Sequence, residues 1–178
     1  MYSFNQFQNL LMFSKKRIYV TNPIISYLIP MEWYLILMSD GSFTQHLYTL
    51  TDTKIKTNLI INFNNNKYIN YKKLYLREIW LENSSKEKLA FAKSIWNLNN
   101  LYEIKFPLHK PIGQSFIDLK IDIHQEINQI FYGYSNNLNK KFQDQHILWG
   151  RQYTIYSKKQ PLVTIEEYFS PKIIQLLY

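Results

Sequence analysis

The sequence predicts an α+β fold in which an antiparallel sheet of about six strands is flanked by helices. Alternating apolar runs between polar turns indicate the strands, and apolar residues at helical spacing indicate the helices. A length of 178 residues, with 46% hydrophobic and 19% charged residues, is enough for one hydrophobic core. Because no repeat or linker divides the chain, we expect a single domain over residues 1–178.

Helices are expected ahead of the sheet and within its second half. Residues 1–20 are interpreted as a peripheral lead-in with a short packed helix. An apolar run over residues 33–38 predicts a helix, and Ser42 is the expected cap of another that begins at Phe43. One long helix is predicted over residues 114–134, from an apolar stripe formed by Phe116, Leu119, Ile123, Ile127 and Ile130. Residues 135–145 are then expected to form a polar connection.

The strand predicted over residues 73–81 is apolar on both faces, which is typical of a strand buried on both sides. Arg77 points into one of these apolar layers. A guanidinium group keeps its charge, so its burial requires an anion from the protein or from a ligand. The strand over residues 89–96 returns beside it and presents small residues on one face, namely Ala90, Ala92 and Ser94. Such a face leaves room for a closely packed helix or for a ligand cavity.

Further strands are predicted over residues 54–63, 152–156 and 162–171. Alternation along the last one places Glu167 in an otherwise apolar row. Burial raises the pKa of a carboxyl group, whereas a nearby cation lowers it. Glu167 and Arg77 therefore need the same explanation: either they form a buried structural ion pair, or they belong to a ligand site.

Composition narrows the possible functions. The net charge is +8, but the lysines occur only in short scattered pairs, so dedicated nucleic-acid binding is not favoured. The absence of cysteine excludes disulfides, thiolate metal sites and a cysteine nucleophile. The four histidines lack metal-ligand spacing, and no phosphate-binding glycine loop or serine nucleophile elbow occurs. We therefore expect neither a metal nor a cofactor.

The abundance of Asn, Ile, Lys, Tyr and Phe, whose codons are AT-rich, indicates an AT-rich genome such as that of an organelle. No signal peptide or transmembrane stretch is evident, which favours a soluble protein.

Four short blocks occur in the order found in one enzyme family. They are residues 76–79 (Leu-Arg-Glu-Ile) with the return over 89–94, the Pro-Ile-Gly turn at 111–113, residues 148–151 (Leu-Trp-Gly-Arg), and residues 164–171, where Glu167 stands four before a proline. Residues 40–44 also resemble a helix start of that family. From about Trp33 onward the chain thus resembles the chorismate pyruvate-lyase family, and most of all its plastid and cyanobacterial branch.

The resemblance implies cofactor-free conversion of chorismate to 4-hydroxybenzoate and pyruvate, in a buried site for a small aromatic acid. By position, Arg77 would hold the ring carboxylate, assisted by the backbone N–H groups of Phe43 and Ile112. Glu167 would lie near the 4-hydroxyl end of the ring and act as a general base. Arg77 and Glu167 are therefore the expected catalytic residues.

Two further positions are expected in the substrate site. Gly113 belongs to the Pro-Ile-Gly turn, and Lys93 follows Ala92 where bacterial enzymes of the family have Gly-Arg. Lys93 keeps the positive charge but loses the bidentate geometry of arginine. The segment over residues 117–145 is also longer than in those enzymes.

The leading hypothesis is a chorismate lyase-like enzyme that supplies 4-hydroxybenzoate for quinone biosynthesis, soluble in the plastid (chloroplast) or, alternatively, in the cytoplasm. The runner-up is a non-catalytic module that binds small aromatic acids and has the fold of the effector-binding domains of bacterial regulators. A third possibility is a purely structural bridge between Arg77 and Glu167. The expected partner is a small chorismate-like acid, without nucleic acid or a membrane span, and the expected state is a monomer or weak oligomer.

Overall fold

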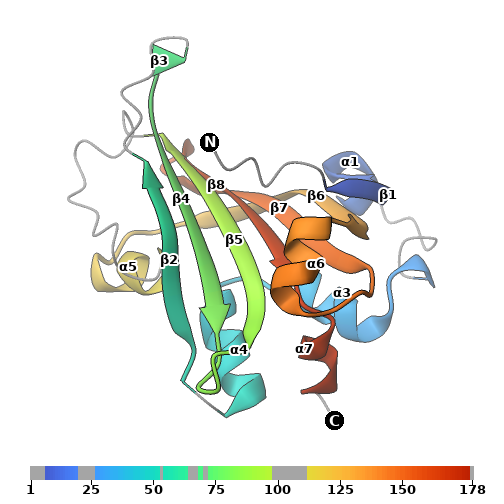
Figure 1. Cartoon of the computed structure of the whole chain (residues 1–178). Helices are drawn as coiled ribbons and strands as arrows, with labels where there is room; N and C mark the ends of the chain where they lie inside the picture. The colour runs from blue at the N-terminus through green and yellow to red at the C-terminus, as the bar shows by residue number, and fades with distance from the viewer. Residues whose placement is uncertain are drawn as a thin grey trace.

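The computed structural model describes residues 7–19, 27–52, 54–63, 68–69, 72–97 and 112–176. An antiparallel sheet flanked by helices confirms the predicted fold class (Figure 1). The sheet has eight strands, more than the six expected, in the order β1-β6-β7-β8-β5-β4-β2, and the short β3 pairs with β4. The strands are β1 (Gln8–Ser14), β2 (Lys56–Phe63), β3 (Tyr68–Ile69), β4 (Lys72–Glu82), β5 (Lys88–Asn97), β6 (His124–Tyr134), β7 (Leu148–Ser157) and β8 (Gln160–Phe169).

Helices cover both faces of this sheet (Figure 1). The described helices are α1 (Lys15–Tyr19), α3 (Met31–Leu37), α4 (Phe43–Thr51), α5 (Ile112–Asp118), α6 (Asn136–Phe142) and α7 (Lys172–Gln175). Helices α3 and α4 confirm the predictions for their segments. Ser42 occupies the N-cap position of α4, but its side chain makes no capping hydrogen bond.

Two separate apolar clusters hold the layers together. The larger joins α3, α4 and α5 to one face of the sheet through residues such as Leu37, Leu47 and Phe116. The smaller joins α6 to the opposite face and contains Trp80, Phe91, Leu138, Phe142 and Leu148. Strand β4 contributes buried side chains to both clusters, as its sequence predicted. The face beneath α3, α4 and α5 is called the inner face below.

The prediction of one helix over residues 114–134 is wrong. Helix α5 ends at Asp118, and β6 begins at His124. A register shift between Ile127 and Gln129 explains the misleading pattern, because this bulge returns Ile130 to the inner face, where Ile127 also points. A spacing of three residues on one face, which indicates a helix, is here produced by a bulged strand. Leu119 and Ile123, two members of the expected core stripe, are both 37% exposed.

Three other local predictions also need correction. Residues 8–14 form strand β1 and not a helix, with Leu10 and Leu11 exposed on the edge of the sheet. The expected connection over residues 135–145 contains α6, whose Leu138 is buried. Gly113 lies in the first turn of α5 and not in a loop. Pro111, the first residue of the predicted Pro-Ile-Gly turn, lies outside the described residues.

Gly150 shows how the smaller cluster is packed against β7. The Phe131 ring lies against its backbone, and a Cβ atom at this position would overlap that ring and stand 2.6 Å from the Glu167 carbonyl oxygen. Phe131 in turn packs on Tyr168, with ring centroids 5.1 Å apart. The Gly of the Trp-Gly-Arg block therefore provides the space for an aromatic side chain from the neighbouring strand.

Replacing Gly150 by Ala should destabilise the fold by about 1–3 kcal/mol, because the added methyl group overpacks a contact that includes backbone. Chemical denaturation followed by circular dichroism measures this loss. Ser157→Ala, at the half-exposed end of the same strand, serves as the control and should change little. Equal stability of the two variants would contradict the described packing of Phe131 on Gly150.

Candidate active site

A cavity of about 570 Å³ lies against the inner face of the sheet. Its floor comes from β4, β5, β7 and β8, through Ile79, Leu81, Ala92, Ser94, Tyr153, Ile155, Ile165 and Glu167. Its cover comes from residues 40–45, from α5, and from the segment 120–125 that leads into β6. The small residues Ala92 and Ser94 thus leave room for a cavity, which was one of the two outcomes that their pattern allowed.

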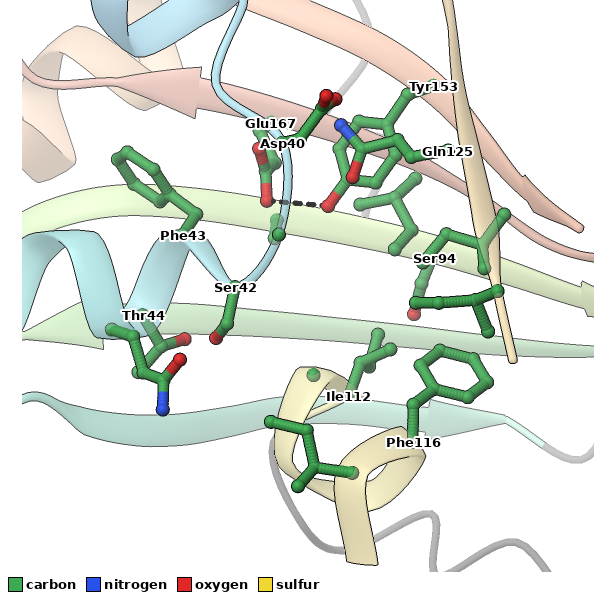
Figure 2. Close-up of a pocket in the computed structure, with 18 of the residues that line it drawn as sticks. Asp40, Ser42, Phe43, Thr44, Ser94, Ile112, Phe116, Gln125, Tyr153 and Glu167 are labelled. Atoms are coloured by element: carbon green, nitrogen blue, oxygen red, sulfur yellow. Dashed lines mark hydrogen bonds between the residues drawn. The ribbon is translucent and has the colours of Figure 1, made fainter. Parts of the chain in front are cut away.

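Glu167 lies in this cavity with both carboxylate oxygens hydrogen-bonded. The side chain of Arg151 donates from Nε to Oε2 at 2.8 Å, and the Tyr153 hydroxyl donates to Oε1 at 3.0 Å (Figure 2). Burial and the adjacent Glu167 charge raise the pKa of Tyr153 well above its ordinary value. Tyr153 therefore stays a neutral donor, and Glu167 has a permanent cation as its partner.

Arg151 connects Glu167 to the rest of the fold. Its guanidinium is fully buried, and Nη1 donates to the carbonyl oxygens of Ile36 (3.2 Å), Leu37 (3.2 Å) and Ser39 (2.8 Å) at the end of α3. Although burial lowers the pKa of Arg151, the Glu167 charge outweighs this and the pKa is raised. The guanidinium carbon also lies 4.9 Å from the centre of the Tyr153 ring.

Sequence reasoning did not select Arg151 as a functional residue, although it lies in the Trp-Gly-Arg block. A usable signal was present. Alternation along β7 places Arg151 in one row with Trp149, Tyr153 and Ile155, which is the same argument that selected Arg77.

Arg77 is buried on the inner face, with 2% of its surface exposed, and does not pair with Glu167. The structure therefore rules out the predicted structural bridge between them. In the sheet register the two residues stand at different positions along their strands, so they are not directly across from each other. Arg77 aligns with Ser94, Ile165 and Tyr153, whereas Glu167 aligns with Ala92. Three strand spacings of about 4.8 Å separate the backbones of Arg77 and Tyr153 by roughly 14 Å.

The guanidinium of Arg77 is incompletely satisfied. Its Nε and Nη1 atoms are buried and find no hydrogen-bond partner in the part of the chain that the structure describes, and the same holds for the Tyr75 hydroxyl. Burial lowers the pKa of Arg77. Arg77 does not itself line the cavity, but its row neighbour Ser94 does. This arrangement leaves a buried cation, next to the cavity floor, in need of an anion.

Phe43, Ile112 and Gly113 line the cavity, as expected for members of the predicted site. Phe43 begins α4 and Ile112 begins α5, so both helix starts face the cavity. A Cβ atom on Gly113 would stand 2.7 Å from the Cβ atom of Ser42. Gly113 is therefore required for close approach of α5 to the start of α4 rather than for a turn.

The structure does not bring Lys93 to this cavity, which corrects the expectation that it binds substrate. Neighbouring strand residues face opposite sides of a sheet, so Lys93 points away from the inner face that Ala92 and Ser94 share. Its register partners across the sheet are Glu78 on β4 and Glu166 on β8. Lys93 therefore belongs to a polar row on the outer face.

Among the described residues, no three His, Cys, Asp or Glu side chains are placed to share a metal ion, and no helix is long and apolar enough to cross a membrane.

The antiparallel sheet flanked by helices is an α+β fold that several solved structures share. One is gene product SA0254 from Staphylococcus aureus, with a TM-score of 0.57 and 10% identity over 74% of this chain and 89% of that chain. Another is the effector domain of PhnF from Mycobacterium smegmatis, with a TM-score of 0.55 and 7% identity over 74% of this chain and 90% of that one. Identities this low show a shared fold.

The family follows from sequence. Residues 37–177 match the model of the Rv2949c-like chorismate pyruvate-lyase family, and the chain belongs to that family. Its relatives include proteins named "Uncharacterized protein ycf21". The one from Antithamnion sp. is 39% identical over 88% of both chains, and the one from Cyanophora paradoxa is 32% identical over 84% of this chain and 82% of its own length.

Replacing Arg151 by Met should destabilise the protein by about 3–5 kcal/mol, because Glu167 would lose its buried cation and the carbonyl groups of Leu37 and Ser39 would lose this donor. Urea denaturation of wild type and of the Arg151→Met variant measures this loss of stability. The double variant Arg151→Met, Glu167→Gln should regain part of the loss, since it removes the uncompensated charge. A loss below about 1 kcal/mol in the single variant would contradict the role given to Arg151.

Glu78, the neighbour of Lys93, should make stability depend on pH. Burial raises the pKa of its carboxyl group more than Lys93 lowers it. A folded-state pKa above the unfolded value favours folding at low pH, and that contribution is lost as pH rises through the folded pKa. Glu78→Gln should therefore be more stable than wild type at pH 7, with the difference shrinking toward pH 4. Denaturation midpoints at both pH values measure it, and a difference that grows toward low pH would refute it.

Proposed function

We propose that this chain is a chorismate pyruvate-lyase that eliminates pyruvate from chorismate and releases 4-hydroxybenzoate. One observation carries the proposal: Arg77 and Glu167 lie on the same face of the sheet, but Glu167 is paired with Arg151 while Arg77 lacks an anion among the described residues. A substrate carboxylate would supply that anion, and the planar guanidinium suits such a group.

The substrate would extend over the floor formed by Ala92, Ser94 and Ile165, between the two charged positions. Arg77 would hold the ring carboxylate, with the backbone N–H groups of Phe43 and Ile112 directed at the same ligand from the cover. Glu167 would then face the opposite end of the ring. A ligand fixed at both ends presents one particular carbon to the carboxylate, which is the positioning that such a reaction needs.

The chemistry requires a base and no redox step. Glu167 takes the proton from C4 of the ring, and the electrons of that C–H bond form a new ring double bond. The C3–O bond breaks, and the enolpyruvyl group leaves and takes up a proton as pyruvate. Arg151 and Tyr153 fix the orientation of Glu167, and the carboxylate oxygens have lone pairs beyond the two that these donors occupy.

The cellular role that fits this product is the supply of 4-hydroxybenzoate for quinone biosynthesis, in a plastid. The relatives named ycf21 belong to algal plastid genomes, and the AT-rich composition of the chain agrees with such an origin.

A second candidate is a module that binds a small aromatic acid without converting it. The structural neighbours favour it, because they include a chain described as a possible transcriptional regulator, with a TM-score of 0.57, and the effector domain of PhnF. Those likenesses rest on 8% and 7% identity, so they support the fold more than the use of the cavity.

Incubation of the purified protein with chorismate should yield 4-hydroxybenzoate and pyruvate, detected by chromatography. Glu167→Gln should lower kcat by at least about 100-fold, because it removes the base. Arg77→Met should raise KM by roughly 10- to 100-fold, because it removes the charged donors to the carboxylate. Lys93→Met is the matched control, and it should leave both constants unchanged because Lys93 lies on the outer face.

The two candidate functions separate in this experiment. Binding of 4-hydroxybenzoate by a well-folded wild-type protein that forms no product would reject the lyase and support the binding module. A strong loss of activity in Lys93→Met, with no loss of activity in Arg77→Met, would reject the orientation of the substrate given above.

A further inference from the structure

One buried donor in the cavity is left without a partner. Among the described residues, six buried side-chain nitrogen or oxygen atoms have no hydrogen-bond partner, and they belong to Tyr75, Arg77, Glu78, Gln125 and Arg151. Of these five residues, Gln125 alone lines the cavity. The atom concerned is its amide nitrogen, Nε2. A buried N–H group without an acceptor is unfavourable, so this position is suited to an oxygen atom that the protein does not provide.

The other polar side chains of the cavity floor are already satisfied. Tyr153 donates to Glu167 at 3.0 Å, and both oxygens of Glu167 accept hydrogen bonds. Ser94 accepts from the Trp96 indole at 3.1 Å and lies 3.4 Å from the Arg77 carbonyl oxygen. The amide of Gln125 is therefore a free donor beside this floor, which a ligand can engage without breaking a hydrogen bond between described residues.

The strand order places Gln125, on β6, on the Glu167 side of the cavity floor, with β7 between β6 and β8. Gln125 pairs with Ile155, and Tyr153 is two residues along β7 on the same face, so Gln125 and Tyr153 are diagonal neighbours. In Figure 2 the side chains of Tyr153 and Gln125 extend toward Glu167 from the right of the view. Arg77 lies on β4, which β8 and β5 separate from β7. The amide and the guanidinium thus approach a bound ligand from opposite sides of the floor.

The charges nearby select the kind of oxygen that Gln125 would bind. Glu167 forms an ion pair with Arg151 and accepts a hydrogen bond from Tyr153, and Asp40 also lines the cavity. A second carboxylate from the ligand would meet repulsion from these groups at short range. Lys120 also lines the cavity but is solvent-exposed, so water screens its charge. A neutral hydroxyl or ether oxygen is the acceptor that this position favours.

We propose that Gln125 is a specificity-determining residue whose side-chain amide donates a hydrogen bond to a neutral oxygen on the ligand ring, opposite the carboxylate. The proposal rests on the proposed function in one respect, namely that Arg77 holds the carboxylate. It assigns the ligand class more narrowly, as ring acids with a hydroxyl or ether oxygen far from the carboxylate. Acids of the same size without that oxygen leave the Gln125 amide unpaired and bind less well.

The test compares two probes, 4-hydroxybenzoate and benzoate, by isothermal titration calorimetry on the full chain. Wild type should bind 4-hydroxybenzoate at least about tenfold more tightly than benzoate. Methionine has nearly the same shape as glutamine but lacks the amide. Gln125→Met should therefore weaken the binding of 4-hydroxybenzoate by about tenfold, or 1.4 kcal/mol, and leave the affinity for benzoate unchanged. Gln129→Leu is the control on the outer face, where Gln129 pairs with Gln152, and it should alter neither affinity.

Thermal unfolding without ligand separates a binding role from a structural one. Because Nε2 has no partner among the described residues, Gln125→Met should unfold at the same temperature as wild type or higher. A clear loss of stability together with equal weakening of both acids would assign Gln125 to the fold and overturn the proposal.

The outcomes also separate this inference from the proposed function. If wild type binds neither acid, the carboxylate site at Arg77 fails, and the inference built on it fails as well. If wild type binds both acids and Gln125→Met keeps the same ratio of affinities, only the inference about Gln125 is rejected. Selective binding without turnover of chorismate would retain Gln125 as the specificity determinant and reject the lyase.

Discussion

The buried guanidinium of Arg151 is the interaction on which the architecture of the site depends. Its donors reach Glu167 on β8 and three carbonyl groups at the C-terminal end of α3 and just beyond it, so one side chain ties the sheet to the segment that leads into α4. Burial of an ion pair is favourable only when its remaining hydrogen bonds are made, and here most of them are. Displacing Arg151 would loosen Glu167 and the cavity cover together.

Much of the fold was predictable because alternation is a strong signal in strands packed on both faces. Strands β4, β5, β7 and β8 follow their predicted segments, and Arg77 and Glu167 were both expected on apolar faces. The failure over residues 114–134 has a physical cause, since the bulge in β6 gives a strand the spacing of a helix. Helix α6 was missed because its few apolar residues occur in a polar, Asn-rich segment.

The site was predicted less completely than the fold. Alternation identified Arg77 and Glu167 as residues that need partners, but only the register between strands reveals which partner each one has. Glu167 has Arg151 beside it, while Arg77 lies in the neighbouring row. Lys93 was selected for its positive charge, but it lies on the outer face of β5 and therefore points away from the cavity. No pattern in the sequence selected Gln125. Its proposed role rests on the lack of a hydrogen-bond partner for Nε2 among the described residues, which only the three-dimensional contacts reveal.

The pairing of β5 with β8 has a consequence for how the cavity forms during folding. Strands β2, β4 and β5 form one half of the sheet, β1, β6, β7 and β8 form the other, and this pairing is the seam between them. Arg77 belongs to one half and Glu167 to the other, so a partly folded chain with both halves intact but undocked contains no site. Contacts across the seam join residues far apart in sequence, which slows folding. Recovery of ligand binding would then report a late folding step, whereas secondary structure would return earlier.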